Sequence, residues 1–328
     1  MNLNKYQSQN FQEFTVIMPV FEDLRSCQKI VFELNKLFSN KIRIILIDDG
    51  SIVDPVAKSF QNSDIENLII ITLYKNVGHQ AALAIGIDVA EKKNLILGEH
   101  LVLMDSDGED SPNAISYLLD VALANMNSIV VAERTKRSEG IFFKIFYWIY
   151  KRIFILLTGR VIDFGNFMVI SKSHISRIIR IDTLSIHIAA SVILSRIPRV
   201  NVPTERSRRY YGSSKMNFVS LCLHGFKALS IFSEEVLVRV GLFCSTIAFI
   251  ALTAVILIIG LKAAEITIPG WASLTVGILM LIFLQTGTIT LMLLLNTKKK
   301  MGDIIFTPNY LEGAREIWIS ETRISKKL

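Results

Sequence analysis

The amino-acid sequence predicts an α/β domain with a mostly parallel sheet, followed by interfacial helices and two transmembrane helices. Over the first half of the 328-residue chain, short β-branched runs alternate with helical stretches, the pattern of parallel strands covered by helices. Near the other end, Val240–Leu261 and Trp271–Leu295 are apolar and contain no charged residue. Since about 20 apolar residues in a helix cross the hydrocarbon core of a bilayer, each segment is long enough to span a membrane. The alternative for both segments is a pair of buried core helices.

Five β-branched runs predict the strands of the sheet: Phe14–Val20, Ile42–Ile47, Leu68–Leu73, Leu101–Met104 and Ser128–Ala132. Helices are expected between them, over Asp23–Phe38, about Gly78–Lys92, and Ser111–Ala124. The last of these opens with Ser-Pro, a frequent helix start. Parallel sheets of this type bind ligands outside the carboxyl ends of their strands, so the residues that follow the strands are the candidates for function.

The chain carries a formal net charge of +7, and 51% of its residues are hydrophobic. This fraction is high for a soluble domain and low for a polytopic transporter, so a soluble domain attached to a membrane fits it. With two expected spans, the basic balance favours anionic lipid headgroups or a phosphorylated substrate, and we expect no nucleic acid partner. The three cysteines, Cys27, Cys222 and Cys244, are scattered and show no metal-site spacing.

Two further apolar segments are expected to lie in the membrane interface. Residues 141–157 are aromatic and apolar except for Lys144, Lys151 and Arg152, which fall on one helical face. Phe218–Phe232 has a similar character and leads into the first span. For residues 141–157 the alternative is a buried helix of the soluble domain. The expected organisation is therefore a soluble domain over 1–215, an interfacial helix over 216–235, two transmembrane helices over 236–297 and a tail over 298–328.

Basic residues predict how the chain is oriented in the lipid bilayer. Arg239 precedes the first span and Lys298, Lys299 and Lys300 follow the second, whereas the loop Lys262–Gly270 has one Lys and one Glu. Because loops rich in Lys and Arg stay in the cytoplasm, we expect the soluble domain and both termini there. The predicted location is the inner (plasma) membrane, as a multi-pass protein.

Acidic residues follow two of the predicted strands at the edge where ligands bind. Asp48 and Asp49 come after the second strand, and Asp105 and Asp107 come after the fourth. Two carboxylates separated by one residue can both reach a hard divalent cation, and Glu109 can supply a third oxygen. The sequence thus predicts a site for a hard divalent cation that neutralises the charge of a leaving diphosphate. The alternative is that each cluster caps the helix or turn that follows it.

Glycine-rich phosphate loops are absent from the sequence, which has no Gly-Lys-Ser/Thr motif and no G-x-G-x-x-G at the first helix. This disfavours a nucleoside triphosphatase and a dinucleotide oxidoreductase. Cations are available instead: Arg134, Lys136, Arg137, Arg206, Arg208, Arg209 and Lys215. Arginine suits phosphate because its guanidinium group can bind two oxygens at once. For Arg206 and Arg208 the alternative is a basic patch that faces solvent or lipid headgroups.

Four motifs fall in the order seen in family 2 glycosyltransferases of the GT-A fold: Pro19-Val20-Phe21-Glu22-Asp23, Asp48-Asp49-Gly50-Ser51, Asn76-Val77-Gly78 and Asp105-Ser106-Asp107. The later run Arg209-Tyr210-Tyr211-Gly212-Ser213-Ser214-Lys215 resembles the R-x-x-G-x-S-K pattern of the polyprenyl-phosphate branch, and residues 163–167 resemble its D-x-G-D-F element. That branch includes dolichol-phosphate mannose synthase and bacterial undecaprenyl-phosphate glucosyltransferases. The resemblance covers roughly residues 15–296 and includes the two carboxy-terminal spans.

The resemblance implies an inverting transfer of a sugar from a nucleotide diphospho-sugar donor to a polyprenyl phosphate such as undecaprenyl phosphate. The implied donor-binding residues are Pro19, Phe21, Asp23, Asp48, Asp49, Asn76 and Asp105. Mg²⁺ or Mn²⁺ would be held by Asp105, Asp107 and Glu109, and the acceptor phosphate by Arg134, Arg137, Arg209, Ser214 and Lys215. Asp163 would act as a base or position the acceptor, and the alternative for it is a turn residue. Related bacterial enzymes also imply a homo-oligomer, with a tetramer as the expected form.

The sequence departs from this family pattern at four positions. Asp23 stands where a nucleotide-contacting Glu is usual, Asn166 replaces an Asp, Met168 replaces an Arg, and Glu109 replaces a Gln. These changes bear on donor identity and acceptor contacts rather than on the reaction class. Two other functions stay open: a glycosyltransferase that extends a lipid-linked oligosaccharide, and an inactive membrane scaffold of the same fold. The first needs a definite base for its acceptor hydroxyl, and the intact Asp-x-Asp disfavours the second.

Overall fold

The structure is a computed structural model that describes residues 12–61, 65–134, 141–212, 218–264, 270–301, 314–319 and 326–327. The chain forms two compact units. The first, called here the sheet unit, comprises residues 1–141, 162–231 and 307–328, and the second, called the helical unit, comprises 142–161 and 232–306. The predicted boundary at residue 215 stays a prediction, but residues 142–161 group with the two long apolar helices rather than with the sheet.

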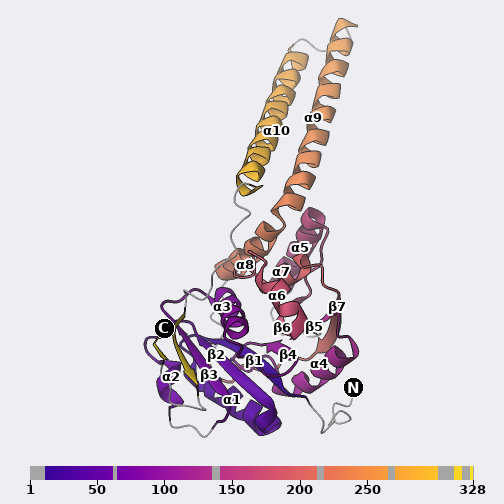
Figure 1. Cartoon of the computed structure of the whole chain (residues 1–328). Helices are drawn as coiled ribbons and strands as arrows, with labels where there is room; N and C mark the ends of the chain where they lie inside the picture. The colour runs from indigo at the N-terminus through magenta and orange to yellow at the C-terminus, as the bar shows by residue number, and fades with distance from the viewer. Residues whose placement is uncertain are drawn as a thin grey trace. The chain divides into compact units, whose positions relative to one another are not determined.

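The sheet unit is built on a mixed sheet whose strands, among the described residues, have the order β7-β5-β6-β4-β1-β2-β3-β8-β9 (Figure 1). Its centre consists of parallel strands: β4 (His100–Leu103), β1 (Phe14–Val20), β2 (Ile42–Asp48) and β3 (Leu68–Leu73). β6 (Phe164–Ser171) runs antiparallel to β4 and to β5 (Ile129–Arg134), and β7 (Arg199–Thr204) is parallel to β5. The five predicted strands are all present, and the prediction of a mostly parallel sheet is confirmed.

Burial on both faces explains why the central strands are nearly continuous apolar runs in the sequence. Every residue of β1 is buried, and in β2 only Arg43 is partly exposed. Thr15 is the polar exception in β1, and its hydroxyl is fully satisfied, because Oγ1 donates to the Leu97 carbonyl at 3.0 Å and accepts from the Leu97 amide at 2.7 Å. The centre of the sheet is therefore a buried, largely apolar scaffold that fixes the loops at its edge.

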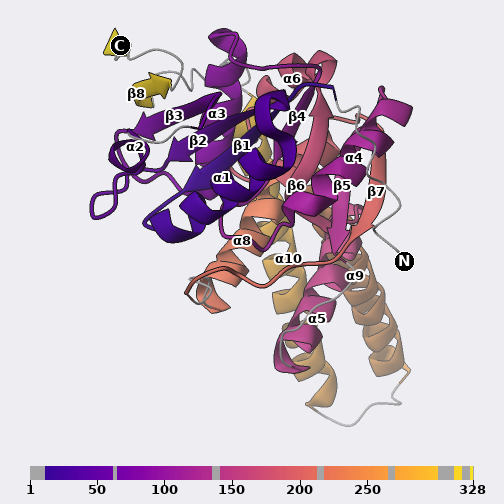
Figure 2. The same ribbon diagram turned by 90° about the horizontal axis from the view of Figure 1, so that it is seen from below.

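Helices cover both faces of the sheet. The side chains of each strand alternate between the two faces, so an apolar strand presents apolar side chains on both, and each face needs a covering layer. α1 (Leu24–Phe38) and α4 (Pro112–Ala124) lie over one face, where their apolar residues pack with Phe14, Val16 and Met18 (Figure 2). α3 (His79–Lys92) lies over the other face, and a β-carbon on its Gly86 would come within 2.6 Å of the Ile47 side chain. Glycine thus lets α3 approach the strands closely. The remaining helices of this unit are η2 (Ser39–Lys41), α2 (Val56–Ser59), α6 (Lys172–Ile179), α7 (Ile188–Leu194) and α8 (Phe218–Ile231).

The tail of the chain, for which the sequence offers no account, adds two strands to the sheet. β8 (Ala314–Ile319) pairs antiparallel with β3, and β9 (Lys326–Lys327) pairs with β8. Trp318 lies opposite Ile70 in this ladder and packs against the core under α1 and α4. The pairing covers the edge of β3, which would otherwise expose a row of unpaired amide and carbonyl groups.

The helical unit contains most of α5 (Ile141–Thr158), together with α9 (Ser233–Ala263) and α10 (Trp271–Met301). α9 and residues 273–290 of α10 are both long and apolar enough to cross a bilayer. Arg239 of α9 donates hydrogen bonds from Nη1 to the carbonyls of Ile155 and Leu156, which lie in the last turn of α5. The Phe154 and Phe232 rings pack edge to face with centroids 5.8 Å apart. These contacts fix the end of α5 to the start of α9.

Candidate active site

Two buried aspartates at the end of β2 organise the loops at the carboxyl edge of the sheet. Asp48 accepts hydrogen bonds from the amides of Ser51 (2.9 Å) and Val56 (3.1 Å). Asp49 accepts from the amides of Val77 (2.7 Å) and Gly78 (2.9 Å). Burial raises the pKa of Asp49, although its two backbone donors act in the opposite direction. Both carboxylates thus hold the loops on which the predicted donor site is built.

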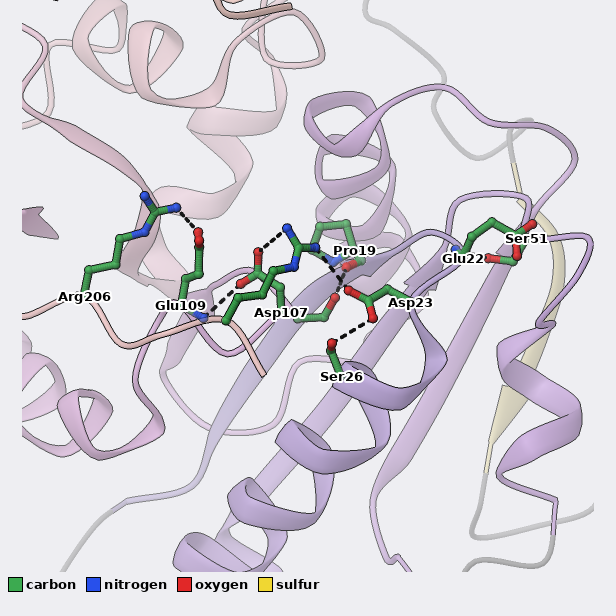
Figure 3. Close-up of polar contacts among 10 residues, drawn as sticks. Pro19, Glu22, Asp23, Ser26, Ser51, Asp107, Glu109 and Arg206 are labelled. Carbon is green, nitrogen blue, oxygen red and sulfur yellow. Dashed lines mark hydrogen bonds and ion pairs between the residues drawn. The ribbon is translucent and has the colours of Figure 1, made fainter. Parts of the chain in front are cut away.

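Glu22 is a further organising residue, and no role was expected for it from the sequence. Its backbone has a φ of 46°, a left-handed conformation that is uncommon outside glycine. Its carboxylate accepts from the amides of Ile52 (2.7 Å), Val53 and Asp54, the latter two at 3.1 Å, and its own amide donates to Ser51 Oγ at 3.1 Å. The loops after β1 and β2 are therefore bound to each other (Figure 3).

The Asp105-Ser106-Asp107 motif forms a tight loop directly after β4. Ser106 is buried, and its hydroxyl donates to the Pro19 carbonyl at 2.7 Å, which ties the motif to the end of β1. The Asp105 amide donates to Asp110 Oδ2 at 3.0 Å, and the Glu109 amide donates to Asp107 Oδ1 at 2.9 Å. The serine between the two predicted metal ligands thus points into the protein, while the aspartates lie at the edge of the sheet.

Residues 205–212, called here the arginine segment, lie against this acidic loop. The Ser207 amide donates to the Glu109 carbonyl at 2.9 Å, and the Tyr210 amide donates to the Asp107 carbonyl at 3.0 Å. Arg206 forms an ion pair with Glu109 (Figure 3). The structure thereby brings the cationic and anionic candidates, which lie far apart in the sequence, into one site.

Arg209 is the central cation of this site. Its Nη2 lies 3.1 Å from Asp23 Oδ2, and its Nη1 lies 3.6 Å from Asp107 Oδ2. Asp23 is itself oriented by Ser26, whose hydroxyl donates to its other oxygen at 2.7 Å. Asp23 and Asp107 were expected on the donor side and Arg209 on the acceptor side, and one guanidinium group contacts both carboxylates.

Tyr210 anchors the arginine segment. Its hydroxyl donates to the Glu33 carboxylate on α1, and the Lys29 ammonium group lies 4.2 Å from the ring centroid. The ring covers Gly108, where a β-carbon would come within 2.5 Å of it and where the φ of 87° favours glycine. The residue between Asp107 and Glu109 is thus glycine because both its conformation and the tyrosine ring require it.

The electrostatics of the acidic loop fit a divalent cation. Burial, followed by the charge of Asp105, raises the pKa of Asp107 to about 6, while Arg209 and Arg206 act to lower it. The described residues contain no group of three or more acidic, histidine or cysteine side chains with metal-site geometry. Mg²⁺ needs no such group, because it is commonly held by one or two carboxylates, water and substrate phosphates. Asp105 and Asp107 supply the hard oxygens that this cation prefers.

Of the remaining predicted site residues, some lie at the edge of the sheet and others fall outside the described part of the chain. Asp163 lies just before β6, where its Oδ2 accepts from Asn201 Nδ2 at 3.0 Å. Phe21 and Asn76 are exposed at the same edge of the sheet as Asp49. The Arg134 side chain, together with Arg137, Ser214 and Lys215, lies outside the described residues. Their predicted contacts with an acceptor phosphate stay predictions.

Three histidines meet in the sheet unit, from α3, the start of α7, and α8. The His187 and His224 rings stack with centroids 4.3 Å apart, and those of His79 and His224 are 6.0 Å apart. His187 Nδ1 accepts from the Ala190 amide at 3.2 Å and so caps α7. Burial, followed by the charges of His224 and His79, lowers the pKa of His187 to about 3, and Lys227 adds to this effect. His187 is therefore neutral in the folded protein.

This neutral histidine is expected to make the sheet unit acid-sensitive. In the unfolded chain its pKa returns to about 6.5, so the unfolded state binds more protons between about pH 6.5 and 3, and stability is lost as pH falls through that range. We expect a loss of about 2 kcal/mol between about pH 7 and pH 5 from this residue. The measurement is the thermal unfolding of the full chain in detergent at each pH. An H187N variant, which can still cap α7, is expected to lose less stability on acidification; an equal loss would contradict the assignment.

Comparison with known proteins identifies the family. Residues 15–179 match the model of glycosyl transferase family 2. The undecaprenyl-phosphate 4-deoxy-4-formamido-L-arabinose transferase of Yersinia enterocolitica is 22% identical over 275 residues, which cover 81% of each chain. That of Klebsiella pneumoniae (strain 342) is 23% identical over 80% of each chain, and an uncharacterized glycosyltransferase of Synechocystis is 23% identical over 82% of this chain and 85% of its own.

Among solved structures, glucosyl-3-phosphoglycerate synthase from Mycobacterium tuberculosis, in complex with Mn²⁺, uridine diphosphate and phosphoglyceric acid, has a TM-score of 0.50 and 12% identity. The likeness covers 72% of this chain and 82% of that one, and it shows the shared fold. The expected GT-A fold is thus confirmed, and the family match extends from β1 through the acidic loop to α6. The protein is a glycosyltransferase, and the chain belongs to glycosyl transferase family 2.

Proposed function

We propose that the protein transfers a sugar from a nucleotide diphospho-sugar to a polyprenyl phosphate, with undecaprenyl phosphate as the acceptor. The observation that carries this proposal is the contact of Arg209 with both Asp23 and Asp107, because it places a phosphate-binding cation beside carboxylates suited to a metal-bound diphosphate. The undecaprenyl-phosphate transferases that match four fifths of the chain support the same acceptor. The two long apolar helices support attachment to the membrane in which such an acceptor resides.

In this proposal the donor is bound by the loops after β1, β2 and β3. Asp105 and Asp107 hold Mg²⁺ or Mn²⁺, with Glu109 as the third candidate ligand once it leaves its ion pair with Arg206. When bound, the cation neutralises the diphosphate as it leaves. The loop that carries both aspartates is tied to the end of β1 by the Ser106 hydrogen bond to the Pro19 carbonyl, and Asp107 is oriented within the loop by the Glu109 amide. The residues proposed to hold the nucleotide are Pro19, Phe21, Asp23, Asp48, Asp49 and Asn76.

The acceptor in this proposal is its own nucleophile. A phosphate monoester is mostly ionised near neutral pH, so its attack on the anomeric carbon, with inversion, needs no strong base. The more demanding task is to bring two anionic groups together, which Arg209 and the other basic candidates, Arg134, Arg137 and Lys215 with Ser214, are proposed to do. Asp163, whose Oδ2 accepts a hydrogen bond from Asn201, is then proposed to position the acceptor rather than to act as a base.

The pairing of the tail with the sheet supports the proposed orientation in the membrane. β8 and β3 belong to the same sheet, which supports the proposal that the segments before α9 and after α10 lie on the same side of a bilayer. Two helices that each cross the bilayer once satisfy this condition. We propose that this side is the cytoplasm, because the basic residues flank the spans there. A homo-oligomer, with a tetramer as the expected form, stays part of the proposal.

The test is a product analysis with purified full-length protein in lipid nanodiscs. Undecaprenyl phosphate and Mn²⁺ or Mg²⁺ are supplied with a panel of nucleotide sugars that includes uridine diphosphate linked to 4-deoxy-4-formamido-L-arabinose, the sugar named for the relatives. The expected product is a lipid carrying one sugar through one phosphate. Formation of a lengthened lipid-linked oligosaccharide, with undecaprenyl phosphate unused, would contradict the proposal and favour the chain-extending alternative.

A further inference from the structure

A chain of buried amides connects three elements at the active-site edge of the sheet. The Ile188 amide, at the start of α7, donates to Gln80 Oε1 at 2.6 Å. Gln80, in the first turn of α3, in turn donates from Nε2 to Asn166 Oδ1 of β6 at 3.0 Å. Both side chains are more than nine-tenths buried, with exposed fractions of 6% and 8%. The two hydrogen bonds therefore hold both amides in one arrangement away from bulk solvent.

This chain of hydrogen bonds fixes the direction in which Asn166 points its amide. The oxygen and nitrogen of an amide side chain are usually hard to tell apart, and the hydrogen-bond network decides between them. Here the network ends at a backbone N–H, which can only donate, so Gln80 must present its oxygen to Ile188 and its NH₂ to Asn166. Asn166 then turns its oxygen toward Gln80 and its NH₂ away from it. Among the described residues, no side chain or backbone group accepts a hydrogen bond from that NH₂ group.

Asn166 lies near the start of β6, at the edge of the sheet where the acidic loop follows β4. β4 and β6 are antiparallel, with Leu103 opposite Met168 as the last paired position. Continuing both strands by two residues leads to Asp105 on one and Asn166 on the other. This register puts Asn166 at the same edge of the sheet as Asp105, one of the two carboxylates proposed to hold the metal and its diphosphate.

We propose that Asn166 donates a hydrogen bond from Nδ2 to a phosphoryl oxygen during sugar transfer, and that Gln80 is the positioning residue that keeps it a donor. The inference rests on the proposed function. A sugar hydroxyl can donate or accept, so either end of an amide would serve it, whereas a phosphoryl oxygen only accepts. An NH₂ group that is fixed in the donating orientation therefore favours binding of a phosphoryl oxygen. Asn166 also cannot take up a proton and so cannot act as a base. This agrees with an acceptor phosphate that is already ionised, because no proton has to be removed from it before it attacks.

A Gln80→Glu substitution tests the direction of the amide without changing Asn166. The introduced carboxylate still accepts from the Ile188 amide, but it has no hydrogen to give to Asn166. Asn166 is then expected to rotate, donate to the carboxylate, and turn its oxygen toward the substrate. The companion variant is N166D, in which one oxygen accepts from Gln80 and the other faces the substrate as a negative charge. The matched control is Q28E, which makes the same chemical change on the exposed side of α1.

The assay measures kcat and the KM for undecaprenyl phosphate and for the nucleotide sugar separately, with the unfolding temperature of each variant as a check on folding. Q80E and N166D are each expected to lose about tenfold or more in kcat/KM, while Q28E keeps the wild-type value. If only the KM for undecaprenyl phosphate rises in these two variants, Asn166 contacts the acceptor phosphate. If only the KM for the nucleotide sugar rises, Asn166 contacts the diphosphate of the donor. A higher kcat in N166D would overturn the inference, since it would show that a carboxylate acting as a base at this position speeds the reaction. Unchanged kinetics in Q80E would also overturn it.

Direct binding separates this inference from the proposed function. The affinities of the same variants for uridine diphosphate and for farnesyl phosphate are measured by calorimetry, which needs no turnover. If the wild-type protein transfers no sugar to undecaprenyl phosphate, the proposed function fails, while a weaker affinity of Q80E for either ligand still supports the amide contact. If the wild-type protein is active and neither affinity nor KM changes in Q80E, the amide inference alone fails.

Discussion

An Asp107→Ala variant is expected to lose sugar transfer by about 10²–10³-fold or more, which is the scale of removing a group that stabilises charge in a transition state. The Asp107 side chain is largely buried beside Asp105. Its pKa is raised to about 6 because the negative charge of the carboxylate is unfavourable there without a cation. Removal of this carboxylate takes away one of two oxygens suited to the metal, and it leaves Arg209 with Asp23 alone. Mn²⁺ binding, followed by electron paramagnetic resonance, is expected to weaken together with the transfer rate.

The control for this prediction is Asp182→Ala, which removes an exposed aspartate from the same unit. Asp107→Asn serves as an isosteric companion, because its oxygen can still accept from the Glu109 amide while the charge is lost. All variants are expected to insert into the membrane normally, since the helical unit is untouched. Full activity in either Asp107 variant would contradict the metal assignment.

An Arg209→Ala variant is expected to raise the KM for undecaprenyl phosphate by about tenfold or more, because a hydrogen bond to a charged group contributes about 1.5–3 kcal/mol. The nucleotide-sugar KM is expected to change less. The reason is that the arginine segment keeps its backbone bonds to the acidic loop and its Tyr210 anchor, so the donor-binding loops stay in place. Initial rates measured at varied concentrations of each substrate separate the two effects.

Arg209→Lys is the matched variant for that measurement. Lysine keeps the charge but cannot reach Asp23 and Asp107 with two nitrogens at once, so it is expected to restore only part of the acceptor use. An Arg209→Ala enzyme with equal losses for donor and acceptor would place Arg209 on the diphosphate instead of the acceptor phosphate.

The sheet was predictable because its strands are buried on both faces and therefore stand out as apolar runs. The same property placed Asp48 and Asp105 correctly at the ends of β2 and β4, since the strands end where the apolar residues stop. β6 and β7 did not stand out, because their residues mix apolar and polar side chains. β8 could not be predicted, since it pairs with β3 across most of the length of the chain, and no local pattern encodes such a partner.

The members of the candidate site were easier to predict than their contacts. The motifs identified Asp23, Asp107 and Arg209, yet the pairing of Arg209 with Asp23 joins residues 186 positions apart and depends on the fold. Glu22 and Gln80 were missed because their roles are to bind backbone amides or another side chain within folded loops. Neither the three hydrogen bonds that backbone amides donate to the Glu22 carboxylate nor the buried chain of side-chain amides leaves a signature in a single sequence.

The position of β8 sets an order of events during synthesis. The ribosome makes β3 early, but its pairing partner follows both long apolar helices, so the sheet is finished only after α9 and α10 have emerged. Until then the edge formed by Ile69, Ile70 and Ile71 is open to any other strand, which is a known route to aggregation. Rapid synthesis of the segment from α9 to β8 limits how long this edge is exposed. Synthesis of the two long apolar helices thus precedes completion of the enzyme's sheet.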